Sequence, residues 1–199
     1  WNSPAIEAVT ILFMLIAGIN FGTHFLVWRR WSFAPYARDP EAGLYLLIVV
    51  ASVFGIAWFL FEHQTYGNYW MALRFAAFNV VSIATTTGFA NTDYSLWPGF
   101  APMWMLFLCC FVTCSGSTGG GIKMIRAELM ARQAIREMTR IIHPRAIVPV
   151  KLGGDPVENN IIFAVLAFML VYGGSVIVMV MLLAASGLDI ITSVSAVIA

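Results

Sequence analysis

The sequence predicts an all-α membrane protein built from repeats of a long helix, a short re-entrant helix, a loop and a second helix. Two compositional observations place the chain in lipid: 60% of its 199 residues are hydrophobic and only 11% are charged, against about a quarter in a soluble domain. The third observation is a short apolar segment that stops abruptly at "TTTGF" (residues 85–89). Because that segment is too short to cross a bilayer, we expect it to enter and leave on one side.

Three apolar segments are long enough to span a membrane. Residues 5–27, 43–61 and 160–185 correspond to roughly 28 to 39 Å of helix, and a hydrocarbon core is about 30 Å thick. Residues 99–114 are also apolar but run directly into "SGSTGGGIK" (115–123). That helix reaches across only if the glycine segment lies at membrane depth, so we expect a broken helix over residues 97–142 with a glycine loop at 115–122.

Two apolar segments are too short to span. Residues 69–84 give roughly 24 Å of helix, and residues 188–199 give less. Runs of this length are typical of buried or re-entrant helices. Asn68 is a good cap for the first of them. We expect Arg74, inside it, to tether the helix to an outer carboxylate such as Glu62 or Asp93.

Basic residues are concentrated in two connecting segments. One lies between residues 29 and 38 and the other between residues 123 and 151, and the positive-inside rule places both in the cytoplasm. This requires residues 69–84 to return to the outer side. The outer side then holds acidic residues that raise the local concentration of cations, namely Glu7, Glu62, Asp93 and Asp189.

The threonine segment indicates a path for cations. Non-helical backbone at membrane depth is tolerated only where it is buried in protein or lines a watery cavity, so we expect the carbonyls of "TTTG" to replace an ion's water shell. The β-branched Thr85, Thr86 and Thr87 favour an extended chain. Gly88 permits a positive φ that turns neighbouring carbonyls toward one axis. The alternative is an ordinary helix-to-loop turn.

The glycine segment only partly matches a phosphate-binding loop. Gly116 and Gly121 have the required spacing, but Ile122 precedes Lys123 and Met124 stands where Ser or Thr belongs. A break in a membrane helix fits better, because glycines allow close backbone approach. Small polar residues can satisfy the freed backbone groups, namely Ser115, Ser117 and Thr118. The alternative is a kink needed only for packing.

Other function classes find little support. The net charge of +1 shows no nucleic-acid footprint, and no acid–base pair, nucleophile–base pair or metal cluster is visible, so we do not expect an enzyme. The three cysteines, Cys109, Cys110 and Cys114, lie in an apolar run and read as core thiols. After the glycine segment, a helix ending at "HP" (143–144) carries an apolar face and, on another face, a basic stripe at i,i+4 spacing that consists of Glu128, Arg132, Arg136 and Arg140. We expect that stripe to contact lipid headgroups, a partner or solvent.

The stretch "FNVVSIATTTGFANTDYSLWPGF" (78–100), followed by "CSGSTGGGIKMIRAE" (114–128), resembles the third repeat of the Trk/Ktr/HKT family of potassium-uptake proteins. The resemblance covers the whole chain as an interior piece of a protein more than twice as long. It implies four non-identical repeats of helix, pore helix, filter strand and helix around one pore. A chain carrying one filter strand cannot complete such a pore alone.

The resemblance also implies boundaries. Residues 1–30 are the last helix of the second repeat, and residues 31–142 are the third repeat. Residues 143–159 are a cytoplasmic linker, and residues 160–199 begin the fourth repeat with an outer helix and a truncated pore helix. The third repeat then contains four parts: an outer helix (43–61), a pore helix (69–84), a filter (85–89) and the broken inner helix (97–142).

For function, the resemblance implies uptake of potassium, K⁺ being the transported ion. The filter ligands are the carbonyls of Thr86 and Thr87, flanked by those of Thr85 and Gly88. The glycine loop acts as a gate, in which Lys123 repels cations when the loop is closed; its members are Gly116, Gly119, Gly120, Gly121 and Lys123.

The implied setting is the bacterial inner membrane, crossed several times by a homodimer. Its partners are membrane lipid, the remaining repeats of the same protein and cytosolic nucleotide-binding regulatory subunits, with no nucleic acid. Two alternatives stay open: a secondary transporter whose broken helices bind another solute, and a membrane scaffold that conducts nothing.

Overall fold

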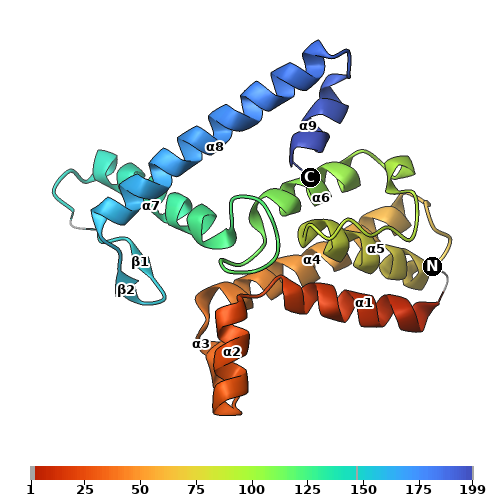
Figure 1. Cartoon of the computed structure of the whole chain (residues 1–199), viewed down its shortest axis with the longest axis horizontal. Helices are drawn as coiled ribbons and strands as arrows, with labels where there is room; N and C mark the ends of the chain where they lie inside the picture. Colours follow the sequence, from red (N-terminus) through yellow and green to blue (C-terminus); the bar gives the residue numbers. More distant parts are fainter. Residues whose placement is uncertain (1–2, 147, 199) are drawn as a thin grey trace. The chain divides into compact units, whose positions relative to one another are not determined.

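The structure, a computed structural model, describes residues 3–146 and 148–198. These residues form helices and one short hairpin (Figure 1). The all-α fold expected from the sequence is therefore confirmed. The described chain divides into two compact units, residues 3–123 and residues 124–198.

The first unit is arranged around the short helix α5. That helix packs against α1, α4 and α6 and buries side chains around most of its circumference. A re-entrant helix needs this enclosure by protein. The helices of this unit are α1 (Pro4–Ala17), α2 (Phe21–Arg30), α3 (Ala34–Arg38), α4 (Pro40–Glu62), α5 (Tyr69–Ala84), the 3₁₀ turn η1 (Tyr94–Leu96) and α6 (Phe100–Phe111).

Side-chain caps set the starts of α4 and α5. The Asp39 carboxylate accepts hydrogen bonds from the main-chain N–H groups of Glu41 (3.0 Å) and Ala42 (3.3 Å), so α4 begins three residues before the expected span. The Asn68 side chain accepts from the Trp70 N–H at 3.0 Å, which is the expected cap. Helix α5 has the bounds predicted for the short helix.

The expectation of one continuous helix over residues 5–27 is wrong. Helices α1 and α2 meet at a 97° bend, and Figure 1 shows α2 turning sharply away from α1. Asn20 causes the restart, because its side chain caps α2 by accepting from the Gly22 N–H at 2.8 Å. Gly18 lets the Tyr45 side chain of α4 pack closely against the bend, because a Cβ there would overlap it. Two described helices, α4 and α8, are long and apolar enough to cross a membrane, or three if the bent pair counts as one span.

The second unit consists of α7 (Met124–Ile142), the strands β1 (Lys151–Leu152) and β2 (Asp155–Pro156), α8 (Asn159–Ala185) and α9 (Ile190–Ile198). The strands pair antiparallel, with Lys151 opposite Pro156. The hairpin was not predicted. Its neighbourhood packs α7 onto α8 through a small core of Leu129, Val150 and Ile162.

The basic stripe of α7 is only partly a surface feature. Arg136 is 8% exposed and donates to the Asn159 side chain at 3.0 Å. Arg132 pairs with Glu128, as i,i+4 spacing favours, at 2.5 Å and also donates to the Lys151 carbonyl at 2.9 Å. Much of this stripe therefore fastens the hairpin and α8 to α7.

Candidate functional site

Helix α5 ends in a left-handed turn made by threonine. The Thr87 N–H donates to the Ser82 carbonyl at 2.8 Å and the Thr86 N–H to the Ile83 carbonyl at 3.0 Å, the pattern of a helix end that normally uses glycine. Thr86 occupies the glycine position with φ +55°, which is rare for a β-branched residue. The expectation of an extended backbone is therefore wrong at Thr86. The positive φ expected of Gly88 is confirmed, at +79°.

Threonine hydroxyls hold this turn in place. The Thr85 hydroxyl donates to the Val81 carbonyl at 2.8 Å and lies 2.8 Å from the Thr87 hydroxyl. The Thr86 hydroxyl accepts from the Gly120 N–H at 2.9 Å. The side chains thus fix the backbone locally and leave its carbonyl oxygens available.

Four consecutive carbonyls, those of residues 85–88, accept no hydrogen bond from the part of the chain that the structure describes. Among residues 3–146 and 148–198, no group donates a hydrogen bond to the main-chain oxygens of Thr85, Thr86, Thr87 or Gly88. The three threonines border a cavity of about 380 Å³ whose other walls come from α1, Phe89 and Thr118. A row of bare carbonyls beside a cavity is an arrangement that can bind a cation.

The helical chain is interrupted at the glycine segment. Helix α6 ends at Phe111 and α7 starts at Met124. Between them Gly116 and Gly121 have positive φ angles of +72° and +78°. A Cβ on Gly121 would lie 2.6 Å from the Cys110 carbonyl oxygen, and the Ile122 N–H donates to that same oxygen at 2.8 Å. The glycine segment thus folds back tightly onto the end of α6.

The backbone at the break between α1 and α2 forms hydrogen bonds with the glycine segment. The Cys114 N–H donates to the Gly18 carbonyl at 3.1 Å, the Thr118 N–H donates to the Ala17 carbonyl at 3.3 Å, and the Phe21 N–H donates to the Gly116 carbonyl at 3.1 Å. The two non-helical segments therefore satisfy each other's backbone hydrogen-bonding groups, which is what non-helical backbone needs at membrane depth. Sequence reasoning missed this pairing, although the polar Asn20 inside an apolar run was a usable signal.

Polar side chains form further hydrogen bonds with the backbone in and around the glycine segment. The hydroxyls of Ser117 and Thr118 donate to the carbonyls of Cys114 (2.7 Å) and Ala17 (3.2 Å), as expected. The Ser115 N–H donates to the buried Glu41 carboxylate at 2.5 Å. The Lys123 ammonium donates to the carbonyls of Ser117 and Gly119, so its charge lies on the segment itself.

The expected pairing of Arg74 with Glu62 or Asp93 is wrong. Its guanidinium makes a two-pronged contact with Glu7 of α1, with N–O distances of 2.6 and 2.8 Å. Glu7 is only 2% exposed, so it does not contribute to an acidic outer surface either. The packing of α1 against α5 brings the two residues together across 67 positions of sequence, which no local pattern reveals.

Asp93 keeps its expected exposure in the loop that follows the threonine segment. The hydroxyl of Ser95 donates to its carboxylate at 2.6 Å and the Ser95 N–H donates at 3.0 Å. These hydrogen bonds lower the pKa of Asp93, because they stabilise its charged form. The carboxylate that follows the carbonyl row in the sequence therefore favours its charged form.

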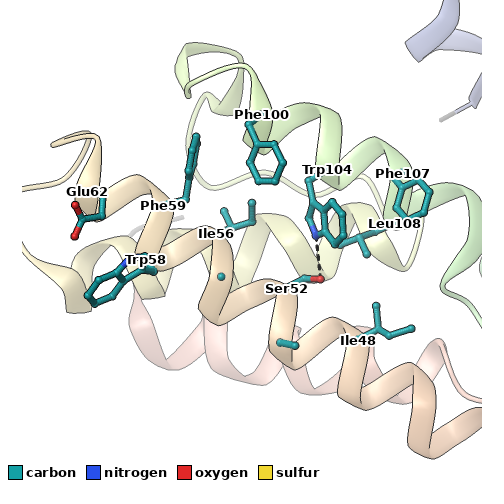
Figure 2. Close-up of a pocket in the computed structure, with 12 residues that line it drawn as sticks. Ile48, Ser52, Ile56, Trp58, Phe59, Glu62, Phe100, Trp104, Phe107 and Leu108 are labelled. Atoms are coloured by element: carbon teal, nitrogen blue, oxygen red, sulfur yellow. Dashed lines mark hydrogen bonds between the residues drawn. The ribbon is translucent and has the colours of Figure 1, made fainter.

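A larger groove lies between α4 and α6, away from the threonine segment. Figure 2 shows it lined mostly by aromatic and aliphatic side chains, and it encloses about 710 Å³. At its floor the Trp104 indole N–H donates to the Ser52 hydroxyl at 3.0 Å. This bond ties α6 to α4.

Helix α5 packs against α1, α4 and α6 and ends in carbonyls that accept no hydrogen bond from the described residues, next to the glycine segment. This arrangement defines a membrane protein of the pore-loop class. The family model described as "TrkH: Cation transport protein" matches residues 1–199, and the chain belongs to this family. The resemblance stated from the filter and glycine motifs is thereby confirmed.

Individual relatives agree. The chain is 40% identical to the Trk system potassium uptake protein TrkH of Halomonas elongata, over 99% of this chain and 41% of that protein. It is 35% identical to the protein of the same name from Escherichia coli K12, over 100% and 41%. The crystal structure of the potassium transporter TrkH from Vibrio parahaemolyticus matches with a TM-score of 0.93 at 36% identity, over 100% of this chain and 43% of that one. The chain thus spans about two fifths of the length of these relatives.

Proposed function

We propose that this chain is part of a potassium-uptake protein in which the carbonyls of Thr85, Thr86, Thr87 and Gly88 bind K⁺ as it crosses the membrane. The observation that carries the proposal is the row of four carbonyls with no donor among the described residues, beside a cavity. The relatives named for potassium uptake support the choice of ion.

The chemistry of the row suits a weakly held cation. Carbonyl oxygens replace the water shell of an ion without the strong charge that would trap it. The C-terminus of α5 adds a partial negative charge close to the row. One strand supplies only a share of the oxygens that a bare ion needs, so the remaining repeats of the protein supply the others.

The glycine segment serves as the gate in this proposal. Gly120 lies within hydrogen-bond distance of the Thr86 hydroxyl, so the segment occupies space next to the filter, and we infer that this is its closed position. Lys123 adds a positive charge held on that segment, which opposes cation passage while the segment stays there. Gly116, Gly119 and Gly121 allow the tight fold that brings it there.

The setting proposed for the whole protein follows the family. It is the bacterial inner membrane, crossed several times, with the protein as a homodimer associated with cytosolic nucleotide-binding regulatory subunits. These proposals rest on the family resemblance and on the Trk system named for the relatives.

Flux into liposomes tests the proposed function. The purified full-length protein should take up ⁸⁶Rb⁺, with unlabelled K⁺ competing far better than Na⁺. Saturable uptake of an organic solute without rubidium flux would favour the secondary-transporter alternative. Absence of any flux from folded protein, with and without its regulatory subunit, would favour a scaffold.

Alanine substitutions should affect ion flux differently at different positions of the glycine segment. A Cβ on Gly121 would overlap carbonyl oxygens of α6 and one on Gly119 would overlap the Thr113 side chain, whereas a Cβ on Gly120 meets only ordinary contacts at 3.8 Å or more. We expect Gly119→Ala and Gly121→Ala to dislodge the closed segment and raise ⁸⁶Rb⁺ flux at least about fivefold, the effect of roughly 1 kcal/mol. Gly120→Ala is the matched control. Equal flux from all three variants would contradict the assignment.

A further inference from the structure

The main chain of Gly120 is held on both sides by threonine side chains from two different segments. Its N–H donates to the Thr86 hydroxyl at 2.9 Å, and its carbonyl accepts from the Thr113 hydroxyl at 3.0 Å. Thr113 is 1% exposed, and its side chain also fills the space beside Gly119. These two hydrogen bonds thus hold Gly120 between the proposed filter and the end of α6.

The neighbouring parts of the glycine segment are anchored differently. Residues 114–118 are bound to the break between α1 and α2, mainly by backbone hydrogen bonds, and Ile122 is bound to the backbone of α6. Gly120 lies between these two anchors. The hydrogen bonds of its N–H and its carbonyl are both made to side-chain hydroxyls, which can rotate away without unfolding a helix.

We propose that the hydroxyls of Thr86 and Thr113 form a latch that positions Gly120 against the filter, and that the gate opens only when both bonds break. The proposal rests on the proposed function. It assigns Thr86 a second role besides its carbonyl, and it makes Thr113 a positioning residue that touches no ion.

The latch also links the gate to the filter. Thr86 has an unfavourable left-handed backbone, and the bond to Gly120 is one of the restraints on that residue. Release of the hydroxyl loosens the turn that aims the carbonyls of Thr86 and Thr87. Opening of the gate therefore changes the affinity of the filter for K⁺, and a filter occupied by K⁺ changes the probability of opening.

The test compares Thr113→Val with Thr113→Ser in the full-length protein, recorded as single channels in planar bilayers. Valine keeps the shape of threonine and removes the donor, whereas serine keeps the donor. We expect Thr113→Val to raise the ratio of open to closed time roughly 3- to 10-fold, the effect of one net hydrogen bond, and Thr113→Ser to stay within about twofold of wild type. The K⁺ concentration for half-maximal current should shift with valine alone.

A cycle with Thr86→Val tests whether both hydroxyls act on the same peptide segment. Its effect on the open-to-closed ratio should be clearly smaller in the Thr113→Val background than in wild type, because both hydroxyls hold Gly120 and members of one hydrogen-bond network are not additive. If Thr113→Val does not fold, Thr86→Val and Thr86→Ser provide the same comparison at a less buried position.

Each outcome bears on the latch. A wild-type protein that conducts while Thr113→Val gates like wild type would overturn the latch and leave the proposed function standing. Equal effects of valine and serine would also overturn it, because packing would then be the cause. A wild-type protein that conducts no Rb⁺ would overturn the proposed function itself.

Discussion

Replacing Arg74 with glutamine is expected to lower the thermal midpoint of the purified full-length protein by at least about 5 °C, because the Glu7 carboxylate is left buried without its partner. Both oxygens of Glu7 are bound by Arg74 in the structure, at 2.6 and 2.8 Å. The pair connects α1 to α5, the helix that ends at the proposed filter, so we expect loss of the bond to loosen residues 85–88 as well. Melting in detergent, followed by tryptophan fluorescence, measures the effect.

The matched comparisons isolate the pair. Glu7→Gln should destabilise in the same direction, and the double variant should recover at least half of the lost midpoint, because no charge is then left alone. Arg30→Gln, at an exposed position of α2, should leave the midpoint unchanged. If Arg74→Gln melts like Arg30→Gln, the pair does not hold α5 in place.

Replacing Gly88 with serine is expected to reduce discrimination between K⁺ and Na⁺ by about tenfold or more, since a left-handed backbone costs a non-glycine residue about 1–2 kcal/mol. The φ angle of Gly88 is +79°, and a Cβ there would meet nothing within 4 Å. The effect therefore comes from redirected carbonyls and not from a clash. Bi-ionic reversal potentials in planar bilayers measure the ratio directly.

Gly99 offers the control for this substitution. It precedes α6 with an ordinary φ of −51° and also has open space around it, so Gly99→Ala should keep the wild-type ion ratio. A Gly88→Ser protein that conducts with an unchanged K⁺/Na⁺ ratio would show that the carbonyl direction at this residue does not set selectivity.

The features that sequence could predict are those fixed by local chemistry. The start of α5 follows from the Asn68 cap and its end from three threonines before Gly88. The break after α6 follows from consecutive glycines, and the end of α7 at Ile142 follows from the Pro144 that comes soon after. In each case the residues that decide the structure lie within a few positions of the feature.

The features that sequence could not predict depend on distant neighbours. The pairing of Glu7 with Arg74 requires α1 to lie beside α5, and the bend at Asn20 is useful only because the glycine segment supplies partners for its backbone. Thr86 looks like a strand former, yet it adopts φ +55° because helix-end hydrogen bonds and Gly120 hold it there. Tertiary contacts outweigh local preference at these sites.

Diffraction from crystals of the full-length protein soaked in thallium tests the central claim most directly, because Tl⁺ substitutes for K⁺ and scatters anomalously. The proposal predicts anomalous peaks within coordination distance of the carbonyl oxygens of Thr86 and Thr87, on an axis shared with the other repeats. Peaks only elsewhere, with residues 85–88 facing lipid or lying in a loop outside the membrane, would contradict it.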